Sequence, residues 1–170
     1  MTIGRERLQL TPAQRRDLMA SPAGWLATGF GSGLAPVAQG TVGSAVSLLP
    51  WLWLRHCSLT NYLLLLLAGC LLGCWACSVA GRRLGVDDHR ALVWDEFIGQ
   101  WLALLPVLDQ PGWWWPLAGF GLFRLFDAGK PWPVSWLDRH LKGGVGVMLD
   151  DVAAGALAAL VLWGLVRWLG

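Results

Sequence analysis

The chain has 170 residues, of which 55% are hydrophobic and 14% are charged, and its mean hydropathy is +0.50. Soluble domains carry about 25% charged residues, so a bilayer is expected to cover much of this surface. The formal net charge of +2 is too small to indicate a nucleic-acid partner. The length predicts one domain over residues 25–170, after a polar N-terminal segment over residues 1–24 that lacks the apolar core of a cleavable signal.

The first predicted element is a short amphipathic helix over residues 11–19. Thr11 can cap it, Pro12 suits its first position, and Gln14 completes a capping box. Because its apolar residues lie among arginines, we expect this helix to lie on the membrane surface.

Five apolar stretches follow and predict an all-α fold, an integral membrane helical bundle. Three of them approach the ~20 residues that a spanning helix needs: residues 37–54, 61–80 and 152–169. Residues 91–108 have a similar length but contain two acids, and residues 113–126 are shorter. We therefore expect four full spans and one short or tilted span.

The positions of the basic residues predict the orientation of this bundle. If the N-terminus is cytoplasmic, eleven of the 13 lysines and arginines fall on the cytoplasmic side, and only Arg55 and Arg167 fall opposite. An excess of basic residues marks the cytoplasmic loops of membrane proteins. We therefore expect a multi-pass protein with its N-terminus in the cytoplasm.

Five acidic residues occupy unusual positions in or beside the apolar stretches. In chain order they are Asp95 and Glu96 in VWDEFIG, Asp127 at the end of the fourth stretch, and Asp150 and Asp151 at the start of the last. On the predicted topology all five lie at about the same depth on the cytoplasmic side. An ionisable group within a span costs ~2.5–3.5 kcal/mol, so this arrangement indicates a function.

Some of these acids also have a structural interpretation. One of the last pair can cap the final helix, where an acid suits the helix dipole. Asp127 can pair with Arg124 or with Lys130, although an acid near a helix C-terminus opposes the dipole. The acids of VWDEFIG have no comparable structural role. Because neighbours on a helix point about 100° apart, one of them can bind a ligand while the other supports it.

Carboxylates that converge at low dielectric do not all stay ionised, because their pKa values rise. A divalent cation removes this difficulty, and carboxylate oxygens suit Mg²⁺ or Mn²⁺. The sequence therefore predicts a metal site formed by the five acids. The basic loop beside them could hold a phosphate through Lys130, Arg139 and Lys142, and the prolines of GKPWP would hold Lys130 rigidly. Alternatively, these bases only orient the protein in the membrane.

A glycine-rich stretch, TGFGSGLAPVAQGTVGS, is a second candidate phosphate site. It interleaves glycines with hydroxyl side chains that include Thr28, Ser32 and Thr41. Backbone N–H groups in such a loop can cradle a phosphate. The stretch matches neither a Walker motif nor a dinucleotide fingerprint, and its glycines can instead allow close helix packing.

Two other features favour structural roles. Cys77 and Arg83 have the spacing of cysteine-dependent phosphatases, but Cys77 continues a long apolar run. The four cysteines are therefore expected to pack as small hydrophobic residues. His89 can act as a general acid or base, but we favour a role as one more polar residue before a helix.

Four motifs, in this order, resemble those of the bacterial phosphatidylglycerophosphatase A family: WLATGFGSGLAPVAQGTVGS, VWDEFIGQW, FRLFDAGKPWP and GGVGVMLDDVAAG. The resemblance implies an all-helical fold, Mg²⁺ dependence and hydrolysis of phosphatidylglycerophosphate to phosphatidylglycerol and inorganic phosphate in phospholipid biosynthesis. It also implies that the acidic motif positions are the five acids above and that the motif lysine is Lys130. The expected location is the bacterial inner membrane, with the active site in the cytoplasm.

The resulting hypothesis is metal-assisted hydrolysis of a phosphomonoester. The acids bind one or two Mg²⁺ ions, and Lys130, with Arg139 or Lys142, stabilises charge on the phosphoryl oxygens. The predicted catalytic residues are Asp95, Glu96, Asp127, Lys130, Asp150 and Asp151. The expected partners are the lipid substrate and membrane lipid. Two alternatives are a phosphatase for another lipid phosphate and, since intramembrane acids also mark ion paths, an ion transporter.

Overall fold

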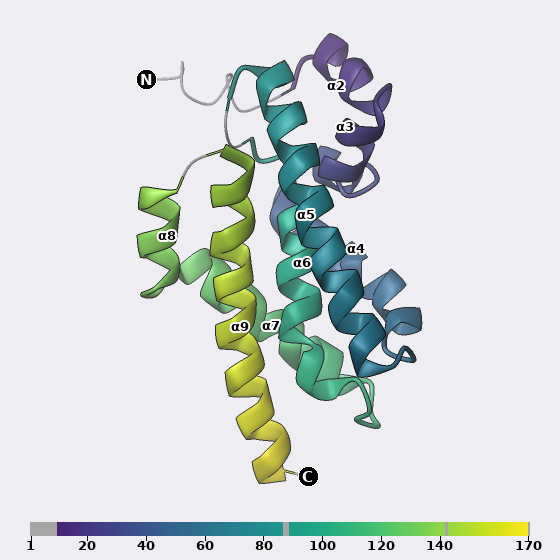
Figure 1. Cartoon of the computed structure of the whole chain (residues 1–170), viewed down its shortest axis with the longest axis vertical. Coiled ribbons are helices and arrows are strands. Elements are labelled where there is room, and N and C mark those ends of the chain that lie inside the picture. Colours follow the sequence, from purple (N-terminus) through teal and green to yellow (C-terminus); the bar gives the residue numbers. More distant parts are fainter. Residues whose placement is uncertain (1–9, 87–88, 142, 170) are drawn as a thin grey trace.

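The computed structural model describes residues 10–86, 89–141 and 143–169, and these residues form eight α-helices, two 3₁₀ helices and no strand (Figure 1). The prediction of an all-α fold is confirmed. In chain order the elements are α2 (Pro12–Met19), α3 (Pro22–Ala27), η1 (Ser32–Leu34), α4 (Gln39–Leu54), α5 (Leu59–Leu84), α6 (Trp94–Ala103), η2 (Leu105–Val107), α7 (Trp114–Gly129), α8 (Val134–His140) and α9 (Gly143–Leu169).

The N-terminal helices α2 and α3 lie at one end of the molecule (Figure 1). Thr11 is the N-cap of α2 and accepts a hydrogen bond from the backbone N–H of Gln14, whose side chain accepts from the backbone N–H of Thr11 at 2.9 Å. The predicted helix and its capping box are confirmed, while its contact with a membrane surface stays a prediction. Ser21 caps α3 by accepting from the N–H of Gly24.

The short helix α6 occupies the centre of the bundle. Eight of its ten residues are buried, and it packs against α4, α5, α7 and α9. The indole N–H of Trp94 donates to the carbonyl of Gly69 on α5 at 2.9 Å, and that of Trp101 donates to the carbonyl of Ser47 on α4 at 2.8 Å. Because a buried indole N–H needs an acceptor, these bonds set the rotation of α6 about its axis.

Two glycines bring α6 and α9 into backbone contact. A Cβ on Gly155 would collide with the carbonyl of Gly99, and a Cβ on Gly99 would lie 2.7 Å from the carbonyl oxygen of Asp151. Small residues allow such a close crossing of helices. Asp95 and Asp151 each lie one turn before one of these glycines, so the crossing brings the two acids close to one another.

Two helices among the described residues are long and apolar enough to cross a membrane: α5 with 26 residues and α9 with 27. At about 1.5 Å per residue each is roughly 40 Å long, which exceeds the ~30 Å hydrocarbon core. The predicted four full spans are not confirmed. Residues 91–108 divide instead into a short connection, α6 and η2, and the ten residues of α6 reach only about 15 Å.

Helix α9 begins earlier than the sequence predicted. The last span was expected over residues 152–169, but α9 starts at Gly143, so Asp150 and Asp151 lie in its third turn. The alternative that one of these acids caps the helix is therefore excluded. The added turns pack closely on α5, because a Cβ on Gly144 would lie 2.6 Å from the carbonyl oxygen of Cys74.

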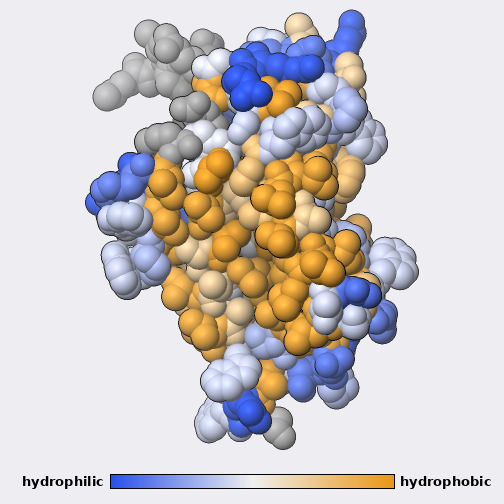
Figure 2. Space-filling view, in the orientation of Figure 1, coloured by the Kyte–Doolittle hydropathy of each residue, from blue (hydrophilic) through white to orange (hydrophobic). Residues whose placement is uncertain are grey.

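An apolar belt covers the middle of the face shown in Figure 2, and polar residues gather at both ends. Exposed leucines of the two longest helices contribute to it: Leu64 and Leu71 of α5 and Leu160 of α9 are 59%, 64% and 66% exposed. Soluble monomers rarely expose continuous apolar patches larger than a few hundred Å². Such a surface is what a bilayer-facing bundle requires.

Candidate active site

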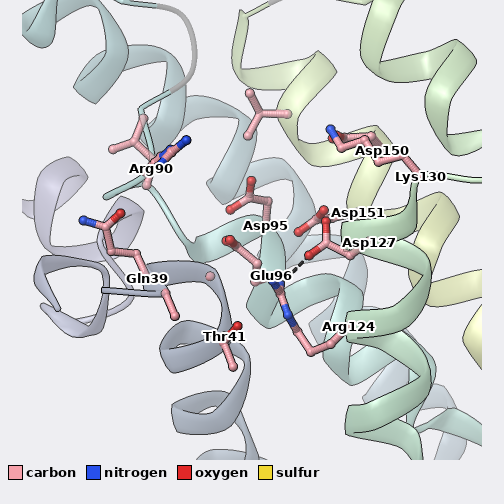
Figure 3. Close-up of a pocket in the computed structure, with 14 residues that line it drawn as sticks. Gln39, Thr41, Arg90, Asp95, Glu96, Arg124, Asp127, Lys130, Asp150 and Asp151 are labelled. Atoms are coloured by element: carbon pink, nitrogen blue, oxygen red, sulfur yellow. Dashed lines mark hydrogen bonds and ion pairs between the residues drawn. The ribbon is translucent and has the colours of Figure 1, made fainter. Parts of the chain in front are cut away.

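Polar side chains from four helices line a cavity of about 300 Å³ (Figure 3). The structure brings together in it all six residues that were predicted to be catalytic: Asp95, Glu96, Asp127, Lys130, Asp150 and Asp151. The other lining residues are Ala38, Gln39, Gly40, Thr41, Arg90, Leu92, Arg124 and Val147. The roles of the six residues stay predictions, but their convergence satisfies the geometric condition on which those predictions depend.

The acids of VWDEFIG open a helix instead of lying inside a span. Asp95 and Glu96 occupy the first turn of α6, where a negative charge suits the helix dipole. Asp95 is only 7% exposed, and Glu96 is partly buried. This position gives the two acids a structural support that the hydropathy of the sequence did not reveal.

Three carboxylates lie close enough to share one cation. One oxygen each from Asp95, Glu96 and Asp151 lies within 4.8 Å of the others. Oε2 of Glu96 and Oδ2 of Asp151 are buried and accept no hydrogen bond from any described residue. A buried carboxylate oxygen without a donor is costly, and a hard divalent cation would satisfy it. The residues present therefore fit Mg²⁺ or Mn²⁺.

The protonation of Glu96 depends on the same surroundings. Burial raises the pKa of Glu96 from its usual 4.5 to about 8; a hydrogen bond with Asp95 opposes this shift, and the charges of Asp151 and Asp127 add to it. A carboxyl group with this pKa holds a proton at neutral pH. Because carboxylates bind metal ions in their deprotonated form, a cation bound here would displace that proton.

Arg124 places a guanidinium group beside the carboxylates. It forms an ion pair with Asp127, three residues later on α7, which confirms the structural pairing considered for this acid (Figure 3). Both side chains line the cavity. The pair offsets the unfavourable position of Asp127 near the C-terminus of its helix and adds a positive charge to the cavity wall.

Lys130 ends α7 as its C-cap, in the left-handed conformation with a φ of 41°. Its Nζ donates to Asp150 at 3.1 Å and also to Asp138 on α8. Burial opposes the charge of Lys130, but these carboxylates outweigh it and raise the pKa of the amine above its usual 10.5. Lys130 therefore stays charged at physiological pH, which suits it to stabilise an anion and excludes a role as general base.

The start of α4 forms another wall of the cavity. Gly40 lies so close to Glu96 that a Cβ on the glycine would collide with Oε1 of the carboxyl group. Thr41 follows it, lines the cavity and is exposed. Of the glycine-rich stretch, it is this last part that reaches the acids.

Three predicted phosphate-binding residues do not line the cavity. The hydroxyl of Thr28 is buried and donates to the carbonyl of Gly24 at 2.8 Å. The hydroxyl of Ser32 donates to the carbonyl of Thr28 at 3.4 Å. Arg139 is exposed and donates to a carbonyl of its own helix at 2.9 Å. Lys142 lies outside the described residues.

The site also contains charged residues that the sequence had not singled out. Arg90 and Arg124 line the cavity, and Asp138 holds Lys130. The available signal for Arg124 was its spacing to Asp127 in FRLFD, which suggested an ion pair and nothing more. Nothing in the sequence marked Arg90 or Asp138, because their neighbours in space come from distant segments.

The alternatives that involve Cys77 and His89 receive no support from the structure. Cys77 is buried inside α5, which continues through Arg83, so the segment is not a strand-loop-helix phosphate loop. The buried ring of His89 accepts from the backbone N–H of Ala91 at 3.1 Å. Neither residue lines the cavity.

Fold and site together define a class: a helical protein with an apolar belt on one face and a cavity in which, among the described residues, five carboxylates meet three cationic side chains. Such a cavity suits a divalent cation together with a phosphate group. The chain belongs to the phosphatidylglycerophosphatase A family, whose model matches residues 25–166.

Individual relatives cover most of the chain. A protein of Escherichia coli named phosphatidylglycerophosphatase A is 41% identical over 151 residues, which cover 89% of this chain and 87% of the relative. A protein of the same name from Haemophilus influenzae is 39% identical over 159 residues, covering 93% and 96%. A relative from Bacteroides thetaiotaomicron is 39% identical over 149 residues, covering 84% and 92%, and its name assigns it provisionally as a phosphatidylinositol-3-phosphatase. No solved structure matches the chain.

Proposed function

We propose that this chain hydrolyses the phosphomonoester of phosphatidylglycerophosphate with the help of Mg²⁺ held in the carboxylate cavity. The observation that carries the proposal is that five carboxylates and three cationic side chains of the described part of the chain line one cavity. Membership of the family, and two relatives named for this activity, support the choice of substrate. Since the product is a membrane phospholipid, the role would lie in phospholipid biosynthesis.

Asp95, Glu96 and Asp151 would hold the cation, because their oxygens lie close together. When bound, a divalent cation lowers the pKa of a water molecule and neutralises charge on phosphoryl oxygens. Asp150 would complete this set, because its Oδ2 pairs with Lys130 while its buried Oδ1 accepts no hydrogen bond from a described residue.

The cationic side chains of the protein have a separate task. Hydrolysis forms a bond between a water oxygen and phosphorus, breaks the bond between phosphorus and the glycerol oxygen, and leaves a proton on that glycerol oxygen. Lys130 and Arg124 would neutralise the charge of the phosphoryl group during this step. Asp127 and Asp150, predicted as metal ligands, would also orient these two cations through the ion pairs.

We further propose that α5 and α9 cross the inner membrane and that the cavity lies at the cytoplasmic end. The cavity lies at the low end of the range for small-molecule sites, about 300–1,000 Å³, so a phosphoglycerol headgroup would fit while two acyl chains would not. The acyl chains would remain in the bilayer beside the apolar belt. The basic residues of the cytoplasmic loops support this orientation.

A second candidate function is hydrolysis of another lipid phosphate, which the name of the Bacteroides thetaiotaomicron relative favours. An ion path would need acids along the length of the bundle, whereas the five acids of the site share one cavity. The structure therefore gives the transporter alternative no support.

The test is release of inorganic phosphate by the purified protein in detergent. Phosphatidylglycerophosphate, phosphatidic acid and phosphatidylinositol 3-phosphate are compared, each with Mg²⁺ and with excess EDTA. We expect fastest release from phosphatidylglycerophosphate, loss of that release in EDTA, and recovery when Mg²⁺ is restored. Faster release from another lipid would favour the second candidate, and release that persists in EDTA would refute the metal assignment.

A further inference from the structure

Arg90 is a cationic residue of the cavity that the proposed reaction does not use. The other two cations that the described residues place in the cavity are paired, Arg124 with Asp127 and Lys130 with two carboxylates. Arg90 is exposed at the cavity and forms no ion pair with any described residue. An arginine without an ion pair to these residues can offer its N–H donors to a ligand, and its planar group suits phosphate oxygens.

The position of Arg90 separates it from the other anion-binding side chain. Arg90 and Lys130 lie on opposite sides of the cavity, with Asp95 between them (Figure 3). Gln39 lies on the same side as Arg90, at the start of α4, and lines the same cavity. The site therefore offers two places for negatively charged groups, one on each side of the carboxylates.

Two backbone hydrogen bonds hold the segment that carries Arg90. The backbone N–H of Leu92 donates to the carbonyl of His89 at 2.8 Å, and the N–H of Val93 donates to the carbonyl of Ala27 at 2.8 Å. The first bond closes a turn around Arg90, and the second joins the segment to α3. A side chain on a fixed backbone loses less entropy when it binds a ligand.

We propose that Arg90, assisted by the amide of Gln39, binds the phosphodiester of the substrate while Lys130 faces the phosphomonoester. This inference rests on the proposed function and names the substrate class: lipids in which a polyol joins a diester phosphate to a monoester phosphate. Two anions separated by a polyol match two cations on opposite sides of the cavity. A lipid phosphate that lacks the diester, such as phosphatidic acid, would leave Arg90 unused.

The test compares Arg90→Gln with Arg82→Gln. Arg82 is an exposed arginine in the last turn of α5 and does not line the cavity, so its exchange makes the same charge change elsewhere. KM and kcat for phosphatidylglycerophosphate are measured in detergent micelles. Inhibition constants are measured for two ligands that each represent part of the substrate. Glycerophosphoglycerol carries the phosphodiester but no phosphomonoester, and inorganic phosphate carries no phosphodiester.

We expect Arg90→Gln to raise KM and the inhibition constant of glycerophosphoglycerol by about tenfold each, because the exchange removes one charge-assisted hydrogen bond. The value of kcat and the inhibition constant of inorganic phosphate should change by less than about twofold. Arg90→Lys should fall between wild type and Arg90→Gln, because lysine keeps the charge and loses the bidentate geometry. Arg82→Gln should behave as wild type.

Three results would overturn the inference: equal weakening of both inhibitors, a fall in kcat alone, or the same loss in Arg82→Gln. A wild-type protein that releases no phosphate from phosphatidylglycerophosphate would instead refute the proposed function. The wild-type measurement and the comparison of inhibitors therefore distinguish the two failures.

Discussion

Two cavities of similar volume lie at opposite ends of α4 and α6, and they differ in the charged residues that line them. The cavity beside the α4–α5 connection and η2 has a volume of about 360 Å³, and one carboxylate, Asp109, lines it. The carboxylate cavity at the other end has a volume of about 300 Å³, and five carboxylates of the described residues line it. Volume therefore does not distinguish the two cavities, and the convergence of charges identifies the candidate site.

The two cavities also differ in the hydrogen bonds that a nearby arginine forms. Near the cavity that Asp109 lines, the guanidinium group of Arg55 donates to the carbonyls of Leu108 and Gln110 at 3.2 and 2.9 Å and lies over the ring of Trp51. The N–H donors of Arg55 therefore stabilise the fold. In the carboxylate cavity Arg90 has no such partners among the described residues, so its donors remain available to a ligand.

The largest expected difference in activity is between two variants that each exchange one acid, Asp151 in one cavity and Asp109 in the other. Asp151→Asn should lower phosphate release on the order of 10³-fold, because it removes a carboxylate from the three that would hold the cation. The matched variant Asp109→Asn, in the other cavity, should keep wild-type activity. Without metal, Asp151→Asn should also unfold at a higher temperature than wild type, since one buried negative charge is gone. Similar activity in the two variants would remove the basis of the comparison.

A smaller loss of activity is expected when Lys130 is exchanged. Lys130→Gln should lower kcat by about 10²-fold through lost charge stabilisation. Arg139→Gln tests a basic residue of α8 that does not line the cavity, and its kcat should stay within about twofold of wild type. Steady-state kinetics of both variants measure the difference. If kcat falls as far in Arg139→Gln as in Lys130→Gln, the active site extends beyond the cavity described.

Gly40→Ala probes the packing of α4 against Glu96. The added methyl group would collide with the carboxyl group, so we expect activity to fall by about tenfold. Gly121→Ala is the control, because a Cβ at this position of α7 meets nothing within 4 Å. Phosphate release and thermal unfolding are measured for both. Full activity of Gly40→Ala would show that Glu96 tolerates displacement and is not held in place by this contact.

The smallest effect is expected at Asp138, a positioning residue for Lys130. Asp138→Asn should raise KM about threefold with little change in kcat, because Asp150 still holds the amine. Asp138→Glu should restore the wild-type KM. Asp17→Asn, which removes the partner of Arg83 at the surface, serves as the control. A loss of thermal stability without a change in KM would assign Asp138 a purely structural role.

Local signals made parts of this structure predictable from the sequence. The capping box at Thr11 fixed the start of α2, because its two hydrogen bonds depend only on residues three apart. The acids could be chosen because carboxylates are rare in apolar stretches and need a reason to be there. Residue type and hydropathy were sufficient for both.

The remaining features depend on contacts between distant segments. Helix α6 is apolar because other helices surround it, whereas a spanning helix is apolar because lipid surrounds it. Hydropathy alone does not distinguish these two cases. The early start of α9 depends on Gly144 fitting against Cys74 of α5, and the ion pair of Lys130 with Asp138 depends on the path of the chain into α8. No spacing within the sequence reports these contacts.

The most direct test of the central claim, a divalent cation held by Asp95, Glu96 and Asp151, is Mn²⁺ binding followed by electron paramagnetic resonance. Purified wild-type protein, Asp151→Asn and Asp109→Asn are titrated with Mn²⁺ and then with Mg²⁺. We predict that wild type and Asp109→Asn bind Mn²⁺ and release it to Mg²⁺, while Asp151→Asn leaves it free in solution. Equal binding by all three proteins, or none by the wild type, would contradict the claim.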